Sequence, residues 1–117
     1  MSEPHGFEVC GRTADGIRLS VSGDVDLAAA PHLLEGILEA GRSCAPGQHV
    51  ILDLGGVTFI DSSGLALLVD AHRRIAAEDQ VLLLGEVPER VRRLFQLTGL
   101  DQLFRLEAEL AEPDRAS

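Results

Sequence analysis

Residues 57–65, Val-Thr-Phe-Ile-Asp-Ser-Ser-Gly-Leu, decide how this chain is expected to fold. Val57 to Ile60 form an extended and mostly apolar stretch, and apolar residues at helical spacing run from Leu65 to Ala76. The polar residues between these stretches, Asp61 to Gly64, therefore mark the junction at which a strand gives way to a helix. On physical grounds alone, an aspartate or serine there is interpreted as a helix cap, because its side-chain oxygen can accept a hydrogen bond from an unpaired backbone amide.

The first part of the chain predicts a β-hairpin followed by a helix. Residues 7–12 and 17–22 flank a glycine-containing turn, and the second of these segments alternates apolar and polar residues. Residues 23–26, Gly-Asp-Val-Asp, are expected to turn the chain. The helix that follows is expected to hold Pro31 in its first turn, where a missing amide is tolerated, and to end near Gly41.

The middle of the chain predicts two buried strands and two further helices. Residues 50–54 form a short apolar run that is typical of a strand buried on both faces, and the glycine pair at 55–56 is expected to break it. After the helix that begins at the Asp-Ser-Ser-Gly junction, residues 81–84 repeat the buried-strand pattern. Pro88 then opens a third helix, and Gly99 is its expected end.

These elements predict an α/β fold in one domain. Beyond the third helix, residues 103–106 are expected to form a short edge strand and residues 107–111 a last helical turn. The order is then β-β-α-β-α-β-α, followed by this short strand and turn, which implies a mixed sheet of about four to five strands covered by about three to four helices. A chain of 117 residues makes one domain, expected over residues 7–111, with flexible ends at 1–6 and 112–117.

The composition excludes several classes of protein. Ten basic residues, all arginine, stand against 19 acidic ones, and the resulting net charge of -9 opposes binding to nucleic acid. Without lysine there is no Walker A loop and no Schiff base. The longest apolar run, residues 65–69, is far shorter than the roughly 20 residues that a membrane span needs. Because the N-terminus also lacks the features of a secretory signal, we expect a cytoplasmic protein without membrane insertion.

No catalytic or metal site is expected. Cys10 and Cys44 are too few for a disulfide framework or a zinc site and are interpreted as small core residues. His72 falls on the apolar stripe of the second helix and is interpreted as a packed histidine, while the other three histidines lack metal-ligand spacing. The nucleophile pattern Gly-x-Ser-x-Gly is absent around Ser62 and Ser63, which removes the best support for a hydrolase.

Two further features are interpreted as structural. The basic cluster of Arg90, Arg92 and Arg93 is expected to lie on the solvated face of the third helix, with Leu94 and Phe95 turned to the core. A docking role for these arginines stays open as an alternative. Gly36 lies inside the first helix, where glycine costs about 1 kcal/mol relative to alanine.

Three blocks of the sequence resemble the STAS domain family, and specifically the bacterial anti-sigma factor antagonists, also called anti-anti-sigma factors. They are the Gly-Asp-Val-Asp segment at 23–26, the strand and Asp-Ser-Ser-Gly-Leu motif within 50–65, and Val-Arg-Arg-Leu-Phe-Gln-Leu-Thr-Gly-Leu at 91–100. The resemblance extends over residues 7–107 and implies a STAS-like sheet. It also implies a cytoplasmic bacterial regulator of transcription that acts by partner switching in a stress response.

The resemblance also implies roles for individual residues. The first serine of the motif, Ser62, matches the phosphate acceptor, and Ser63 follows it at the helix start. Asp61 matches the acid of the motif, and Asp26 matches an acid that lies near the acceptor. The expected partner-binding residues are Asp24, Asp26, Asp61, Ser62, Ser63 and Gly64.

The implied partner is an anti-sigma factor that is also a serine kinase with a histidine-kinase-like ATPase fold. This partner would supply the ATP, so the chain is expected to need no cofactor of its own. A serine phosphatase would reset the switch, and the protein is expected to be a monomer. A phosphoserine carries a charge of about -1.5 to -2 and would add to the charges of Asp61, Asp24 and Asp26. Burying this charge in an interface without new cationic contacts is expected to cost a few kcal/mol and so release the partner.

A second interpretation stays open. The same fold occurs in scaffold or adaptor proteins, such as a stressosome component or a cytoplasmic subunit of a lipid-transport system. In that case Ser62 is only part of a helix start, and the identity of the partner discriminates the two interpretations.

Overall fold

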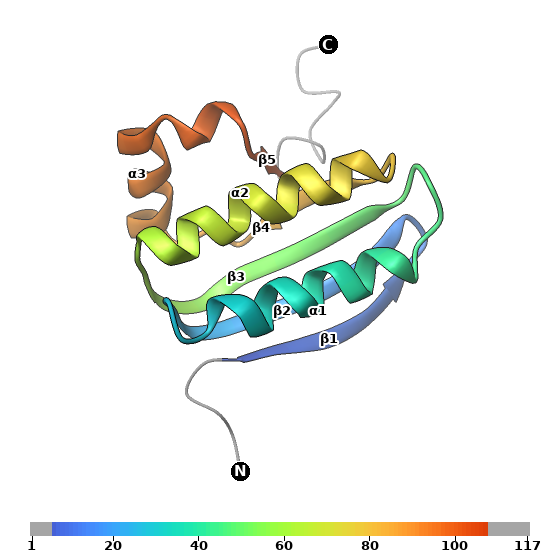
Figure 1. Cartoon of the computed structure of the whole chain (residues 1–117), viewed down its shortest axis with the longest axis horizontal. Coiled ribbons are helices and arrows are strands. Elements are labelled where there is room, and N and C mark those ends of the chain that lie inside the picture. Colours follow the sequence, from blue (N-terminus) through green and yellow to red (C-terminus); the bar gives the residue numbers. More distant parts are fainter. Residues whose placement is uncertain (1–5, 108–117) are drawn as a thin grey trace.

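The computed structural model describes residues 6–107, which form one five-stranded sheet with strand order β1-β2-β3-β4-β5 (Figure 1). The hairpin strand β1 is antiparallel to β2, and the pairs β2/β3, β3/β4 and β4/β5 are parallel. The strands are β1 (Gly6–Thr13), β2 (Gly16–Val25), β3 (His49–Ile60), β4 (Val81–Gly85) and β5 (Arg105–Leu106). The mixed sheet predicted from the sequence is confirmed.

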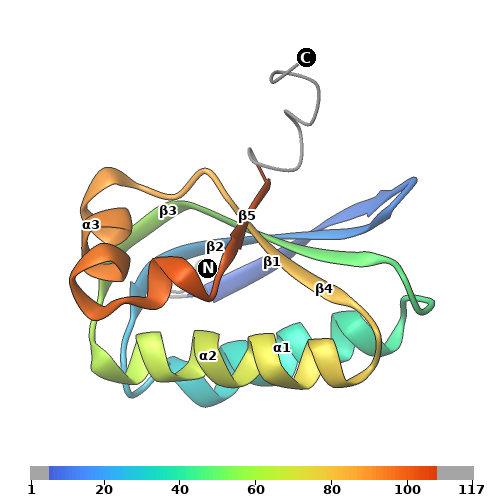
Figure 2. The same ribbon diagram turned by 90° about the horizontal axis from the view of Figure 1, so that it is seen from above.

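Two helices cover one face of this sheet. They are α1 (Ala30–Arg42) and α2 (Ser62–Ala77), which lie side by side in both ribbon views (Figures 1 and 2). The shorter α3 (Glu89–Thr98) lies at the end of the sheet where β3 leads into α2, and the 3₁₀ turn η1 (Leu100–Gln102) follows it. The predicted helix signals hold, because Pro88 precedes α3 and Gly99, with φ of 79°, ends it in the left-handed conformation.

The core lies between the sheet and the helices α1 and α2. Alternate side chains of β2 and β3 point inward and are fully or almost fully buried: Ile17, Leu19, Val21, Val50, Leu52 and Leu54. The facing helix residues are buried as well, among them Leu33, Ile37, Leu68 and Ile75. Burial of each such side chain contributes about 1.5–3 kcal/mol, so this layer holds the strand ends and helix starts in fixed positions.

The glycine pair at 55–56 does not end the third strand, contrary to the sequence prediction. β3 continues to Ile60, and β2 likewise continues to Val25, so residues 23–25 are strand rather than turn. Gly56 pairs with Ser22, and a Cβ at Gly56 would lie 3.2 Å from the Val21 carbonyl oxygen. The glycine therefore allows a close approach of β2, where the ladder shifts register, instead of breaking the strand.

Two other sequence interpretations are corrected by tertiary contacts. Gly36 is packed under the Phe7 ring of β1, and a Cβ there would overlap that ring, so the glycine in α1 makes room for the strand. Cys10 is exposed on β1 and is not a core residue, whereas Cys44 is half-buried and packs against the core. Phe95 is buried, and Arg90, Arg92 and Arg93 are exposed, as predicted.

The chain ends carry predictions that the structure leaves open. Gly6 begins β1, and the short edge strand predicted at 103–106 appears as Arg105–Leu106. Of the flexible end predicted at residues 1–6, Gly6 is instead part of β1, and residues 1–5 lie outside the described residues. The flexible end predicted at 112–117 and most of the helical turn predicted at 107–111 also lie outside them. Within residues 6–107, no helix is long and apolar enough to cross a membrane.

Candidate functional site

The Asp-Ser-Ser-Gly motif lies where the ends of β2 and β3 meet. The two strands are parallel, so their carboxyl ends share one edge of the sheet, and Val25 pairs with Ile60. The next residue, Asp61, donates its amide to the Val25 carbonyl at 3.3 Å. The two acidic segments singled out from the sequence, 24–26 and 61–64, are therefore brought together.

Asp61 is the N-cap of α2. Its backbone is extended, with φ of -112° and ψ of -170°, and its Oδ1 accepts a hydrogen bond from the Gly64 amide at 3.0 Å. Ser62 is then the first residue of the helix and is exposed, whereas Ser63 is half-buried. Within residues 6–107 the Ser62 hydroxyl takes part in no side-chain hydrogen bond. The sequence left open whether an aspartate or a serine caps this helix, and the structure shows that Asp61 is the cap.

The buried Gly64 determines how closely the start of α2 packs on β2. It is buried, and a Cβ at this position would overlap the Val25 carbonyl oxygen and lie 2.6 Å from Ile60 Cγ1. Glycine therefore allows the first turn of the helix to sit directly on the end of β2. This contact fixes where the Ser62 side chain emerges.

Two aspartates of the β2–α1 connection are oriented by different bonds. Asp26 is half-buried, and its Oδ1 accepts from the Ala29 amide at 3.1 Å, which stabilises the turn that leads into α1. Asp24 is exposed, and its Oδ1 accepts from the Thr58 hydroxyl of β3 at 2.8 Å. Within the part of the chain that the structure describes, neither these two carboxylates nor Asp61 forms an ion pair. The edge around Ser62 therefore carries three carboxylates that are not paired with cations of the described residues.

Sequence reasoning missed three neighbours of this edge. Leu27 and Phe59 are large apolar residues with exposed fractions of 73% and 51%. Arg90 of α3 donates from its Nη1 to the Thr58 carbonyl at 3.3 Å, so the basic cluster reaches this edge through one member. Alternation along β3 could have placed Phe59 on the outer face, but the approach of α3 to β3 has no local sequence signal.

The start of α2 can accommodate an anion. The first backbone amides of a helix have no hydrogen-bond partner within the helix, and the helix dipole is positive at this end. A phosphate on a side chain at the first helical position is stabilised by such amides and by the dipole. The negative charges of the neighbouring carboxylates destabilise it.

His72 and the metal prediction concern a different part of α2. His72 is half-buried, and its ring lies edge-on to Phe104 with a centroid distance of 6.3 Å, in line with the packed histidine expected from the sequence. Over residues 6–107, no group of three or more His, Cys, Asp or Glu side chains is arranged to hold a metal ion.

Comparison with known proteins identifies the family. The STAS domain family matches residues 12–112. The anti-sigma-B factor antagonist of Listeria monocytogenes is 31% identical over 101 residues, which cover 86% of this chain and 87% of that protein. The Bacillus subtilis anti-sigma-B factor antagonist is 28% identical over 93 residues, covering 80% and 83% of the two chains. An anti-sigma factor antagonist from Mycobacterium paratuberculosis superimposes with a TM-score of 0.71 at 30% identity, over 91% of this chain and 89% of that one. The chain therefore belongs to the STAS domain family.

Proposed function

We propose that this protein is an anti-sigma factor antagonist whose unphosphorylated form binds an anti-sigma factor and so frees a sigma factor. Phosphorylation of Ser62 ends the binding. The observation that carries the proposal concerns the start of α2. Asp61 caps the helix there, and the exposed Ser62 hydroxyl forms no side-chain hydrogen bond within residues 6–107. The names of the relatives support the same function.

The phosphate would come from ATP held by the partner, which is the anti-sigma factor acting as a serine kinase. Ser62 Oγ attacks the γ-phosphorus, the new O–P bond forms, and the bond from that phosphorus to the β–γ bridging oxygen breaks, so that ADP leaves. The hydroxyl proton passes to a base of the partner. This chain contributes an accessible hydroxyl on a rigid helix start and needs no cofactor. A serine phosphatase would remove the group and restore binding.

Electrostatics gives the proposed switch its direction. A phosphoserine adds about -1.5 to -2 charges at pH 7 to an edge that already holds Asp24, Asp26 and Asp61, on a chain of net charge -9. Burying that group in an interface without new cations costs free energy, and each 1.4 kcal/mol weakens affinity about tenfold. We expect a loss of about a hundredfold or more. No rearrangement of the fold is needed, because the helix start can carry the phosphate where it stands.

The test is an affinity capture from lysate of the native host, with Ser62→Ala and Ser62→Asp as baits and mass spectrometry to identify what they retain. Ser62→Ala is expected to retain a small ATPase of the histidine-kinase-like fold, and Ser62→Asp is expected to lose it. Ala76→Asp, which adds the same charge at an exposed position near the other end of α2, is the matched control and should behave like the wild type. If all baits capture the same transporter or scaffold proteins, the adaptor interpretation replaces this one.

A further inference from the structure

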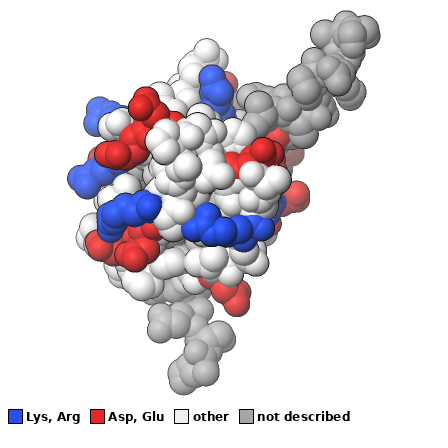
Figure 3. Space-filling model, turned by 90° about the vertical axis from the view of Figure 1, so that its right-hand side faces the viewer, with Lys and Arg blue, Asp and Glu red and all other residues white. Residues whose placement is uncertain are grey.

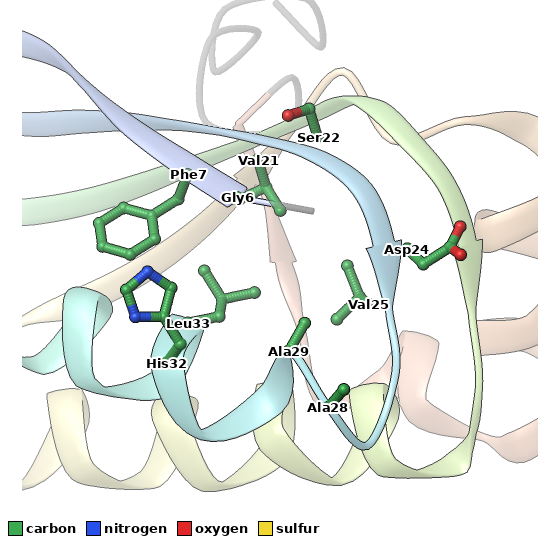
Figure 4. Close-up of a pocket in the computed structure, with 10 residues that line it drawn as sticks. All are labelled: Gly6, Phe7, Val21, Ser22, Asp24, Val25, Ala28, Ala29, His32 and Leu33. Atoms are coloured by element: carbon green, nitrogen blue, oxygen red, sulfur yellow. The ribbon is translucent and has the colours of Figure 1, made fainter. Parts of the chain in front are cut away.

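A pocket of 160 Å³ opens beside the Ser62 edge, between the start of β1 and the connection from β2 to α1 (Figure 4). Its inner wall is made of buried apolar side chains, namely Val21, Val25, Ala29 and Leu33. Exposed Ala28 and His32 stand at its opening, and the Phe7 ring packs against His32 with a centroid distance of 5.1 Å. An apolar interior that reaches the surface is suited to one apolar group.

The pocket and the Ser62 edge both lie at the carboxyl end of β2. Val25 lines the pocket with its side chain, while its carbonyl oxygen accepts from the Asp61 amide. Asp24 lines the pocket too, but its carboxylate points away from it toward β3, where Thr58 holds it (Figure 4). A protein that covers Ser62 and the Asp24 carboxylate therefore lies next to the pocket opening.

The size of the pocket restricts its occupant. An apolar cavity of about 150 Å³ accepts a molecule as large as benzene, so this pocket has room for one leucine, methionine or phenylalanine side chain. Interfaces between proteins commonly depend on a few such side chains that fill a pocket near the centre of the contact. The exposed Leu27 lies in the same connection from β2 to α1.

The charge of the surroundings restricts the occupant further. The Asp24 carboxylate is exposed and forms no ion pair within residues 6–107, on a chain of net charge -9. The neighbouring Arg90 donates to the Thr58 carbonyl and does not pair with Asp24. A partner segment with a basic residue close to its apolar side chain is complementary to this arrangement.

We infer that the pocket is the anchor site for the anti-sigma factor, receiving one apolar side chain from a segment whose neighbouring basic residue pairs with Asp24. This inference rests on the proposed function and adds to it a second contact that does not depend on Ser62. The anchor supplies affinity in the unphosphorylated state, and phosphorylation acts beside it rather than on it.

The test blocks the pocket without touching Ser62. Ala28→Phe places a ring in the opening, and Ala29→Leu fills the interior from its wall. Binding of each variant to the purified anti-sigma factor that the Ser62→Ala bait retains is measured by isothermal titration calorimetry. Ala76→Phe is the matched control for an added exposed ring, and far-UV circular dichroism verifies that each variant is folded. We expect a loss of affinity of tenfold or more for both pocket variants and less than twofold for the control.

A second variant tests the charged half of the inference. Asp24→Asn is expected to weaken binding about threefold or more and to flatten its dependence on salt concentration, because an exposed charge pair is screened by salt. Asp101→Asn, at an exposed position of η1, is the control and should change neither quantity.

The outcomes separate this inference from the proposed function. If Ser62→Asp abolishes binding while Ala28→Phe and Ala29→Leu bind within twofold of the wild type, the pocket inference is wrong and the proposed function stands. If Ser62→Asp binds as tightly as the wild type, the proposed function fails. Two other occupants would also overturn the inference: tighter binding after deletion of residues 1–5 would indicate the chain's own start, and a dimer that Ala28→Phe dissociates in sedimentation experiments would indicate a second copy.

Discussion

The two ends of the sheet differ in how their charged and polar groups are used. At the end opposite Ser62, where α1 and α2 finish, positive and negative side chains are interspersed over the surface (Figure 3). Two helix arginines there are paired within their own helices, Arg74 with Asp70 at 3.2 Å and Arg42 with Glu39 at 3.9 Å. At the Ser62 end, within the described residues, the acids Asp24, Asp26 and Asp61 make no ion pair.

Buried polar groups show the same contrast. Gln80 is only 6% exposed, and its Nε2 donates to the carbonyls of Gly41 and Cys44, both at 2.9 Å, which ties β4 to the end of α1. Around Ser62 the side-chain bonds instead orient surface groups, and the large apolar residues Leu27 and Phe59 are left exposed. A buried polar group thus joins two elements at one end, whereas charged and apolar groups are left exposed at the other. Substitutions of exposed groups at the Ser62 end should therefore change binding more than stability, and substitutions of buried groups at the opposite end should change stability alone.

The largest expected effect on stability is at Gly64. Gly64→Ala forces a methyl group onto the Val25 carbonyl, and because backbone must move, we expect a loss of about 2–3 kcal/mol in the free energy of unfolding. Since that movement displaces Ser62, partner binding should weaken as well. Urea denaturation measures the change in stability, and calorimetry measures the change in binding. An unchanged stability would show that the start of α2 does not rest on β2.

Gln80→Leu tests the opposite end. The substitution keeps the volume but leaves the Gly41 and Cys44 carbonyls without their donor, so we expect a loss of about 1–3 kcal/mol in the free energy of unfolding. Affinity for the anti-sigma factor should stay within twofold of the wild type. A large loss of affinity with little loss of stability would contradict the division between the two ends.

Removal of the Asp61 cap should have a smaller effect. Asp61→Ala deletes the bond to the Gly64 amide, and we expect a loss of about 1 kcal/mol in the free energy of unfolding. Asp61→Asn keeps an acceptor oxygen while removing the charge, so it should retain most of the stability. If both variants lose the same amount, the charge of Asp61 rather than its capping bond stabilises α2.

The smallest expected effect is at Arg18, on the sheet face away from α1 and α2. Arg18 binds Glu107 at 2.9 Å and Asp53 at 3.4 Å, and the hydrogen bond with Glu107 is the main cause that raises the pKa of Arg18. Because the pKa of Arg18 is raised in the folded protein, the charged form of Arg18 stabilises the fold, and this stabilisation is lost only as pH rises through the raised pKa. A change of pH near neutrality therefore leaves the contribution of Arg18 to stability unchanged. The side chains are 25–34% exposed, and Arg18→Met should cost no more than about 1 kcal/mol. Thermal unfolding at low and high salt measures this; a cost that does not fall with salt would point to lost packing instead.

Local signals in the sequence predicted much of the fold. Proline and glycine residues predicted the approximate starts and ends of α1 and α3, and the alternation of apolar and polar residues predicted β2. These signals worked because they depend on residues that are close together in the sequence. The failures at Gly36, Cys10 and the glycine pair at 55–56 share another cause. Each depends on what a neighbouring strand does, such as Phe7 packing on Gly36, and no local pattern records that.

The sequence likewise predicted some features of the candidate site but not others. The strand-to-helix junction at Asp61–Gly64 was evident, and either residue type could have been the cap. That Asp61 takes this role follows only from the geometry of the helix start. The Asp24–Thr58 bond and the pocket beside Val25 arise from the packing of β2 against β3 and α1, so sequence reasoning could not reach them.

The central claim is that phosphate on Ser62 ends binding to the anti-sigma factor, and the most direct test compares two forms of one protein. The unphosphorylated chain and the chain carrying phosphoserine only at position 62 are titrated against the purified anti-sigma factor by calorimetry. The account predicts that Kd rises about a hundredfold or more with the phosphate, while the free energy of unfolding changes little. Equal affinity of the two forms would contradict it.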